Sequence, residues 1–365
     1  MFRVGIIGCG RISHKIAEGV ADNSNKMNLV ALCDVLQGKM IKTEEVYNKK
    51  LKGNKVLNKY TNYKEMIEKE NLDIAIISTE SGYHEEIGLY CLEHGVNTII
   101  EKPLAMSIEG AQRLVDKAEE KGLKLAASHQ NRFNYPIQLL KKAIKENRLG
   151  KIFNGMARIL WTRDDNYYLQ APWRGTWALD GGTLMNQCIH NIDLLNWMMD
   201  DEIDTVYAQT SNYARNIEAE DYGIIVIRYK SGKIATVEGS AVIYPKNLEE
   251  TLTVTGERGT VVVGGMAVNK IDTWRVEGDN EQDYLSIDCG DPHSVYGFGH
   301  RALYKDFVEA LEENRKPLVD GVAGLNAVKI ILAAYKSQKT GLPIRFDEFN
   351  SFASTEMKGL KLRNE

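Results

Sequence analysis

The sequence predicts an α/β domain built on a parallel sheet, followed by a second domain. The observations behind this prediction are the length of 365 residues, a regular alternation of strand and helix patterns in the first third, and a glycine-rich turn after the first strand. A chain of this length exceeds what one hydrophobic core usually holds, so two domains are expected. Strands that alternate with helices of about ten or more residues indicate βαβ units with right-handed crossovers.

Each element of the first domain follows from a local pattern. Short apolar runs rich in β-branched residues predict strands, and apolar residues at intervals of three and four predict helices. The predicted strands are 2–7, 27–33, 73–78, 96–100 and 124–127, and the predicted helices are 12–21, 36–48, 63–69, 83–94 and 108–121.

The turn after the first strand has the pattern of a dinucleotide site. Gly8 permits a tight turn, and Gly10 lets the backbone approach a pyrophosphate at a helix N-terminus, while the small Ser13 stands where a third glycine is usual. Asp34 ends the second strand, where a carboxylate accepts hydrogen bonds from the adenosine ribose. Because that carboxylate would repel a 2′-phosphate, the sequence favours NAD over NADP.

A second candidate site is Glu101-Lys102-Pro103, which follows the predicted strand 96–100. Doubly wound sheets bind ligands at the carboxyl ends of their strands. A lysine held there can donate a hydrogen bond to a substrate hydroxyl and stabilise a developing alkoxide. The alternative is a surface lysine at a strand end.

The segment 181–195 begins with two glycines and continues as an apolar helical pattern. Spacings of four and three place Asn186, His190 and Asp193 on one predicted helix face. Histidine changes its protonation near neutral pH, so this face is a candidate proton-handling site. A packed core histidine with a satisfied hydrogen bond is the alternative.

Composition excludes several function classes. The chain carries 46 basic and 50 acidic residues, a net charge of −4, which argues against a nucleic-acid partner. Its apolar runs are too short to span a membrane, and residues 1–8 lack a signal-peptide layout. Five scattered cysteines indicate reduced thiols, so we expect a cytoplasmic protein without a metal site.

These motifs resemble the Gfo/Idh/MocA oxidoreductases in their order and spacing. The matching marks are Gly8-x-Gly10, Asp34, Glu101-Lys102-Pro103, Asn131-Arg132-Phe133 and the helix with His190-x-x-Asp193. The resemblance implies an NAD-binding Rossmann domain at 1–126 and an α+β domain at 127–365 with a large, mostly antiparallel open sheet. In the second domain we expect strands at 152–161, 205–211, 222–229, 233–241, 250–255 and 259–263 and helices at 137–146, 185–198, 300–312 and 322–337.

The resemblance also implies site residues. His190 is expected as the catalytic base and Lys102 as the hydroxyl donor, although either could pass the proton. Expected cofactor contacts are Gly8, Gly10, Arg11, Ile12, Asp34, Ser78, Thr79, His84, Glu101, Lys102, Gln130, Trp173 and Arg174. Expected substrate contacts are Lys102, Arg158, Arg163, Asn186, His190, Lys246 and Asn247, and Tyr296, His300 and Tyr304 are candidates for either the pocket or the core.

A narrower resemblance is to bacterial UDP-N-acetylglucosaminuronate 3-dehydrogenases. It is carried by the segments 171–177, 185–187, 244–247, 256–261 and 264–271. It implies NAD-dependent oxidation of a CH–OH group at C3 of a UDP-sugar, for surface polysaccharide biosynthesis, by a homo-oligomer (a dimer or tetramer). Many relatives carry aspartate where this chain has Asn186. The alternatives are a dehydrogenase of a free sugar or inositol-type cyclitol, and a non-enzymatic NAD-binding regulator.

Overall fold

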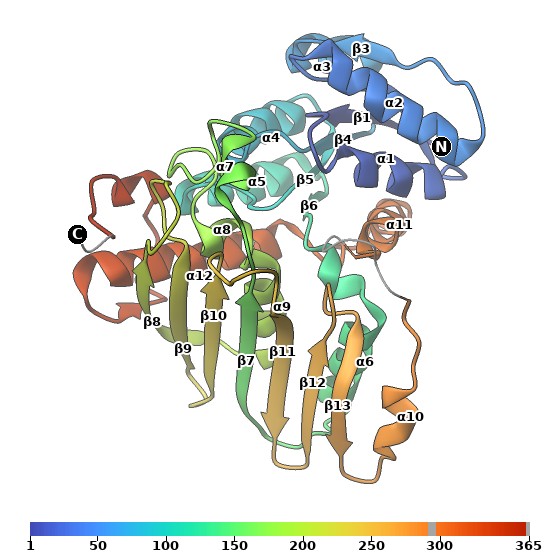
Figure 1. Cartoon of the computed structure of the whole chain (residues 1–365). Coiled ribbons are helices and arrows are strands. Elements are labelled where there is room, and N and C mark those ends of the chain that lie inside the picture. The colour runs from blue at the N-terminus through green and yellow to red at the C-terminus, as the bar shows by residue number, and fades with distance from the viewer. Residues whose placement is uncertain (291–296, 363–365) are drawn as a thin grey trace. The chain divides into compact units, whose positions relative to one another are not determined.

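The computed structural model describes residues 1–290 and 297–362, which form two compact units (Figure 1). Unit 1 comprises Met1–Met106, Gly110–Gln130 and His300–Leu325, and unit 2 comprises Ser107–Glu109, Asn131–Gly299 and Asn326–Glu365. The segment His300–Leu325 lies far beyond residue 126, so unit 1 takes in more of the chain than the predicted first domain.

Unit 1 contains a six-stranded sheet in which every neighbouring pair is parallel. Its strands are β1 (Phe2–Ile7), β2 (Met27–Cys33), β3 (Asn58–Tyr60), β4 (Ile74–Ile77), β5 (Asn97–Ile100) and β6 (Leu125–Ala127). The order β3-β2-β1-β4-β5-β6 reverses direction between β1 and β4. The carboxyl ends of strands at such a reversal are where doubly wound sheets bind ligands.

Helices connect successive strands of this sheet. They are α1 (Ser13–Asp22), α2 (Gln37–Leu51), α3 (Tyr63–Glu70), α4 (His84–Glu93) and α5 (Ile108–Lys121), with the 3₁₀ turn η1 (Ser81–Tyr83) before α4. A second 3₁₀ turn, η2 (Gln130–Phe133), follows β6. A sixth helix, α11 (Gly299–Glu312), packs against α1. A Cβ at Gly19 of α1 would lie 2.8 Å from the Tyr304 ring, so the close approach of these helices requires glycine.

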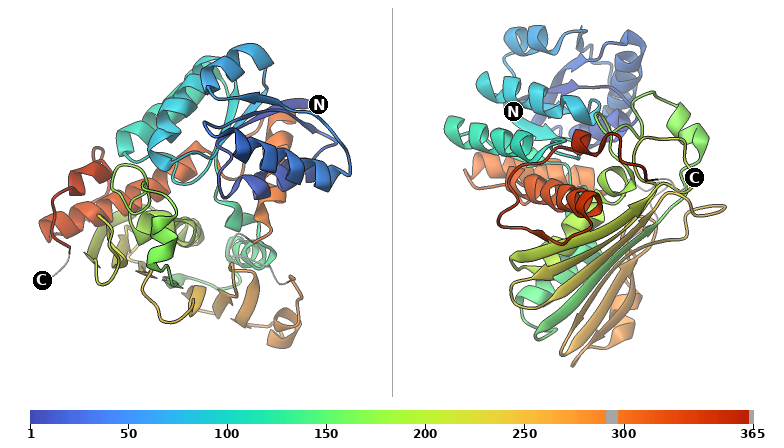
Figure 2. Two further views of the ribbon diagram at one scale, coloured as in Figure 1. Left: turned by 45° about the horizontal axis from the view of Figure 1, so that its top comes forward. Right: turned by 90° about the vertical axis from the view of Figure 1, so that its left-hand side faces the viewer.

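Unit 2 contains an eight-stranded, mostly antiparallel sheet, as predicted (Figure 2). Its strands are β7 (Ile152–Leu160), β8 (Ile203–Ser211), β9 (Tyr222–Tyr229), β10 (Ile234–Ser240), β11 (Glu249–Gly256), β12 (Gly259–Gly264), β13 (Lys270–Val276) and β14 (Ile344–Arg345). The order is β13-β12-β11-β7-β10-β9-β8-β14, and among the described residues β7 and β10 form the parallel pair. The sequence did not predict β3, β13 and β14.

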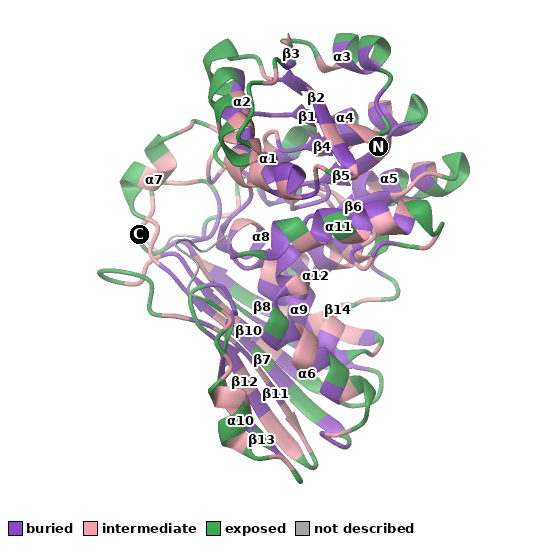
Figure 3. Ribbon diagram, turned by 90° about the vertical axis from the view of Figure 1, so that its right-hand side faces the viewer, coloured by how far each residue is buried: buried purple, intermediate pink, exposed green. Residues whose placement is uncertain are grey.

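Helices cover one face of this sheet, as the burial colours of Figure 3 show. They are α6 (Tyr135–Lys145), α8 (Thr183–Asn186), α9 (Ile189–Met199) and α12 (Gly321–Thr340). A Cβ at Gly155 of β7 would lie 2.6 Å from Leu195 of α9, so the strand glycine lets the helix come close. Two short helices, α7 (Asp165–Leu169) and α10 (Glu281–Leu285), and the 3₁₀ turn η3 (Ser354–Met357) complete the described elements.

The structure also bears on membrane-spanning helices and on the state of the cysteines. Within residues 1–290 and 297–362, no helix combines the length and apolar character that a membrane span requires. The five cysteines are free thiols, and four of them are buried.

Candidate active site

The turn between β1 and α1 has the geometry of a nucleotide loop. Gly8 has φ +92°, and a Cβ there would lie 2.6 Å from the carbonyl carbon of Ser78. The Ser78 hydroxyl donates a hydrogen bond of 2.7 Å to the Gly8 carbonyl oxygen. Both the backbone conformation and the contact with β4 therefore require glycine at position 8.

Asp34 is tied to the same loop. One carboxylate oxygen accepts the Cys9 N–H at 2.8 Å, the other accepts the Leu36 N–H at 2.8 Å, and Lys39 lies 4.0 Å away. Each oxygen keeps lone-pair capacity for a ribose hydroxyl.

The residues at the start of α1 fit a pyrophosphate. Among the described residues, no atom lies within 4 Å of a Cβ built at Gly10, so backbone there is open to a ligand. The N-terminus of α1 at Ile12 has no side-chain cap, and helix N-termini of this kind bind anions. Arg11 beside it is exposed.

The segment that carries Lys102 leaves β5 at its carboxyl end. The Glu101 N–H donates to the Ile77 carbonyl oxygen at 2.8 Å, which continues the pairing with β4. Glu101 is buried and Lys102 is half-buried, and the Lys102–Pro103 peptide bond is cis. Gln130 is also buried in unit 1.

His84, an expected cofactor contact, is buried between main-chain carbonyl groups. Its ring is 1 % exposed, with Nδ1 2.7 Å from the Pro103 carbonyl oxygen and Nε2 3.2 Å from the Thr79 carbonyl oxygen. Burial lowers the pKa of this imidazole below its ordinary value, against the opposing effect of the two carbonyls. A neutral ring donates one hydrogen bond, and the shorter distance favours the bond from Nδ1 to the Pro103 carbonyl oxygen.

In unit 2, the expected single helix 185–198 is two helices. α8 ends at Asn186 and α9 begins at Ile189, so Asn186 and His190 do not share one helical face as predicted. The side-chain amide of Asn186 donates to the Asp180 carboxylate, whose other oxygen accepts the Gly175 N–H at 2.7 Å. A carboxylate therefore lies beside position 186, supplied by a residue that the sequence analysis did not single out.

Asp193 forms a buried ion pair. Its two oxygens accept Nε and Nη2 of Arg132 at 2.7 and 2.6 Å, and the two side chains are 2 % and 8 % exposed. The Arg132 guanidinium also stacks on Trp197, 4.9 Å from the ring centroid. His190, one helical turn earlier in α9, is half-buried.

Glu220 holds the start of α8 and was also missed. It is completely buried and accepts the Leu184 N–H at 2.9 Å and the Tyr335 hydroxyl at 3.0 Å. Burial raises the pKa of this carboxyl to about 8. Glu220 lies in the irregular segment before β9, and its partner at the start of α8 is 36 residues away in the chain, so no local pattern marks it.

Two arginines of unit 2 gather around an aromatic side chain. Arg174 lies 4.3 Å from the Tyr167 ring centroid and 4.6 Å from that of Trp173, and its Nη1 donates to the Tyr167 hydroxyl at 2.7 Å. Arg163 lies 5.3 Å from the Tyr167 centroid and 4.6 Å from that of Trp161. Among the described residues, neither guanidinium forms an ion pair with a carboxylate.

The other expected substrate residues of unit 2 divide into two groups. Arg158 lies on the open sheet face and pairs with Glu238 at 3.1 Å and Glu249 at 2.8 Å, so its charge is already neutralised. Lys246 and Asn247 lie on an exposed loop, which the Asn247 side chain ties to the Thr162 N–H at 2.9 Å. Tyr296 lies outside the described residues.

Comparisons with known proteins agree with this architecture. Residues 2–129 match a family model described as "Oxidoreductase family, NAD-binding Rossmann fold", and residues 141–346 match "Oxidoreductase family, C-terminal alpha/beta domain". The WlbA dehydrogenase from Bordetella pertussis, solved with NADH and UDP-GlcNAcA, is 33 % identical, with a TM-score of 0.82 over 94 % of this chain and 98 % of that protein.

Two further relatives are similar to this chain over most of its length. WlbA from Chromobacterium violaceum, also solved with NADH and UDP-GlcNAcA, is 31 % identical with a TM-score of 0.83, over 94 % of this chain and 95 % of that protein. Myo-inositol 2-dehydrogenase from Thermotoga maritima is 23 % identical over 95 % of this chain and 99 % of that protein. The two family models span most of the chain, and an NAD-binding Rossmann domain precedes the large sheet domain. The chain therefore belongs to the Gfo/Idh/MocA oxidoreductase family.

Proposed function

We propose that this NAD-dependent oxidoreductase oxidises the C3 hydroxyl of UDP-N-acetylglucosaminuronate to the 3-keto sugar, for surface polysaccharide biosynthesis. The substrate class is a nucleotide-linked sugar acid, which carries a diphosphate and a carboxylate. The WlbA dehydrogenases, similar over nearly the whole chain and solved with this ligand, support the proposal.

The observation that carries the proposal is the pair Arg163 and Arg174 around Tyr167. Both guanidiniums stack on aromatic rings, and neither forms an ion pair with a carboxylate among the described residues. Guanidinium groups bind phosphate and carboxylate through two parallel hydrogen bonds. Lys246 and Asn247 stay in the proposed substrate set, whereas Arg158 is left out because two glutamates already neutralise it.

The chemistry assigned to the chain's residues is a proton transfer. NAD, when bound, accepts the hydride from C3. His190 takes the proton of the C3 hydroxyl on an imidazole nitrogen, and Lys102 Nζ donates a hydrogen bond to the C3 oxygen as negative charge develops. Asn186 orients the substrate or the imidazole, since an amide cannot compensate the charge of an imidazolium. Gly8, Gly10 and Asp34 hold the dinucleotide.

Absorbance at the NADH band, with purified enzyme, NAD and either UDP-N-acetylglucosaminuronate or UDP-N-acetylglucosamine, tests the substrate. We expect turnover of UDP-N-acetylglucosaminuronate and little turnover of UDP-N-acetylglucosamine, whose sugar lacks the carboxylate. The variants Lys102→Met and His190→Asn should lose about 10²–10⁴-fold in kcat, the usual contribution of a positioned acid or base. Full activity in both variants would refute the assigned chemistry.

The arginines are tested by KM. Arg163→Gln and Arg174→Gln should raise KM for the UDP-sugar while KM for NAD stays constant. Arg345→Gln is the matched control, because Arg345 forms an exposed pair with Asp204 on β14. Equal effects in all three variants would remove the arginine pair from the proposed site.

A second candidate is the oxidation of a free cyclitol. Myo-inositol 2-dehydrogenase from Thermotoga maritima matches 95 % of this chain, which favours it. An inositol carries no charge, so it gives no reason for two unneutralised arginines. Myo-inositol in the same assay distinguishes the two, and faster turnover of inositol than of the UDP-sugar acid would favour the cyclitol.

A further inference from the structure

We propose that two buried histidines, His84 and His300, are positioning residues that hold the segment Glu101-Lys102-Pro103 from its two sides. The inference deepens the proposed function, because it takes Lys102 as the hydroxyl donor. Each histidine contacts an immediate neighbour of Lys102, so each acts on the lysine through the backbone or through the neighbouring carboxylate. His84, His300 and the segment Glu101-Lys102-Pro103 all belong to unit 1.

His84 holds the Pro103 side. It stands at the first residue of α4, and its Nδ1 lies 2.7 Å from the Pro103 carbonyl oxygen. A neutral imidazole donates through one nitrogen, and this short distance assigns the N–H to Nδ1. Its Nε2 lies 3.2 Å from the Thr79 carbonyl oxygen. The Nδ1 hydrogen bond thus joins the start of α4 to the turn that follows Lys102.

His300 holds the Glu101 side. Its Nε2 lies 3.8 Å from Glu101 Oε1, and the two side chains are 5 % and 9 % exposed. Neither atom has a hydrogen-bond partner within the described residues, and the same is true of the Ser128 hydroxyl. Burial acts to raise the pKa of the Glu101 carboxyl, yet the proximity of His300, Lys102 and the Ser128 hydroxyl brings it below its ordinary value. An ionised carboxylate therefore lies beside the lysine.

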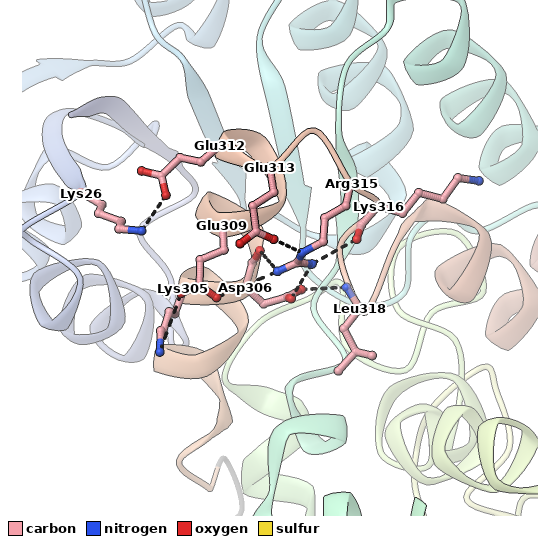
Figure 4. A network of polar contacts seen from close by, with 9 residues as sticks. All are labelled: Lys26, Lys305, Asp306, Glu309, Glu312, Glu313, Arg315, Lys316 and Leu318. Atoms are coloured by element: carbon pink, nitrogen blue, oxygen red, sulfur yellow. Dashed lines mark hydrogen bonds and ion pairs between the residues drawn. The ribbon is translucent and has the colours of Figure 1, made fainter. Parts of the chain in front are cut away.

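α11, which carries His300, contacts the segment after α1 near both of its ends. Near its start, the Asn23 side-chain amide donates to the Arg301 carbonyl oxygen at 3.0 Å. Near its end, Lys26 pairs with Glu312 at 2.6 Å, as Figure 4 shows. In the same network Asp306 accepts the Leu318 N–H at 2.7 Å and pairs with Arg315 at 2.8 Å.

The arrangement gives a role to His84 and His300, which take no part in the proposed proton transfer. His84 is buried and bonds the Pro103 carbonyl oxygen, and His300 is buried against a carboxylate that precedes the lysine. A catalytic group must be held closely, since a displacement of about 1 Å can cost about 10²-fold in rate. We therefore expect both histidines to act on rate through the position and charge environment of Lys102.

The test uses variants that keep or remove one donor atom. Asparagine places its amide nitrogen where histidine has Nδ1, and glutamine places it where histidine has Nε2. His84→Asn and His300→Gln therefore retain the nitrogen beside Pro103 and Glu101, respectively, whereas His84→Ala and His300→Ala remove it. His94→Ala is the control, because His94 lies at the end of α4 in an exposed position and bonds only the Tyr90 carbonyl among the described residues.

The first readout needs no substrate. The pH dependence of Lys102 acylation by dilute acetic anhydride is followed by mass spectrometry of the full-length protein after digestion. We expect each alanine variant to shift the acylation midpoint of Lys102 by about one pH unit, the size of effect that a displaced neighbouring charge produces. The donor-retaining variants and His94→Ala should keep the wild-type midpoint.

The second readout is turnover. We expect kcat to fall about 10- to 100-fold in the alanine variants, with a smaller change in KM for NAD, and to recover in His84→Asn and His300→Gln. A folded alanine variant with an unchanged Lys102 midpoint would overturn the inference. If the alanine variants do not fold, His84→Gln and His300→Asn replace them, because each keeps an amide but moves its donor by one carbon. Wild-type enzyme that oxidises no tested sugar would refute the proposed function alone, since the acylation midpoints still decide the role of the histidines.

Discussion

Replacing Asp193 with alanine should destabilise unit 2 strongly, because it leaves the Arg132 guanidinium buried without its partner. The pair has two charge-assisted hydrogen bonds, of 2.7 and 2.6 Å, and both side chains are less than a tenth exposed. Loss of one partner of a buried pair costs about 3–5 kcal/mol of unfolding free energy. Stacking on Trp197 remains in the variant and compensates little of the lost charge interaction.

Urea unfolding, followed by circular dichroism and tryptophan fluorescence, measures this loss. Asp204→Ala is the matched control, because the Arg345–Asp204 pair has a similar distance of 2.6 Å but its side chains are 63 % and 28 % exposed. An exposed pair contributes about 0–1 kcal/mol. The double variant Arg132→Leu with Asp193→Leu should be more stable than Asp193→Ala, since it removes both charges. A cost for Asp193→Ala no larger than that of Asp204→Ala would refute the reasoning from burial.

Three further predictions follow from the described contacts. Gly8→Ala should weaken NADH binding and lower stability by about 1–3 kcal/mol, because its Cβ meets the Ser78 backbone at positive φ; fluorescence titration and urea unfolding measure this, and wild-type affinity would contradict it. Asp34→Ala should move the ratio of NADPH to NADH dissociation constants toward NADPH, because it removes the carboxylate and leaves Lys39 nearby; an unchanged ratio would contradict it. Glu220→Gln should flatten the pH dependence of stability. The raised pKa of about 8 means that the folded wild type keeps a proton that the unfolded chain releases above pH 4.5, so wild-type stability falls as pH rises between these values. The same change in melting temperature between pH 6 and pH 9 in wild type and variant would speak against this assignment.

The sequence predicted those elements whose structure depends on residues that are close in the chain. The apolar runs with β-branched residues became the strands of unit 1, and Gly8 adopts the positive φ that its motif implies. The three-residue β3 and two-residue β14 are too short to show a period, so no pattern could identify them.

The site depends more on contacts between distant residues. The apolar spacing continues from Leu184 to Leu195 without proline or an internal glycine, so the break after Asn186 gave no signal. Asp193 finds Arg132 61 residues away, and the paired residues belong to two separate motifs of the sequence. The motifs thus identified important residues, while the partner of each was fixed by tertiary structure.

The discontinuous course of the chain through the two units has a consequence for synthesis. A ribosome completes β1 to β6 early, but α11, which covers Gly19 and supplies His300, follows only after the whole sheet of unit 2 except β14. β7 likewise emerges before β10 and β11, the strands on its two sides. The nascent protein therefore exposes apolar surface of both units until its last quarter is made, and its Lys102 segment acquires the second of its two supports at that late stage.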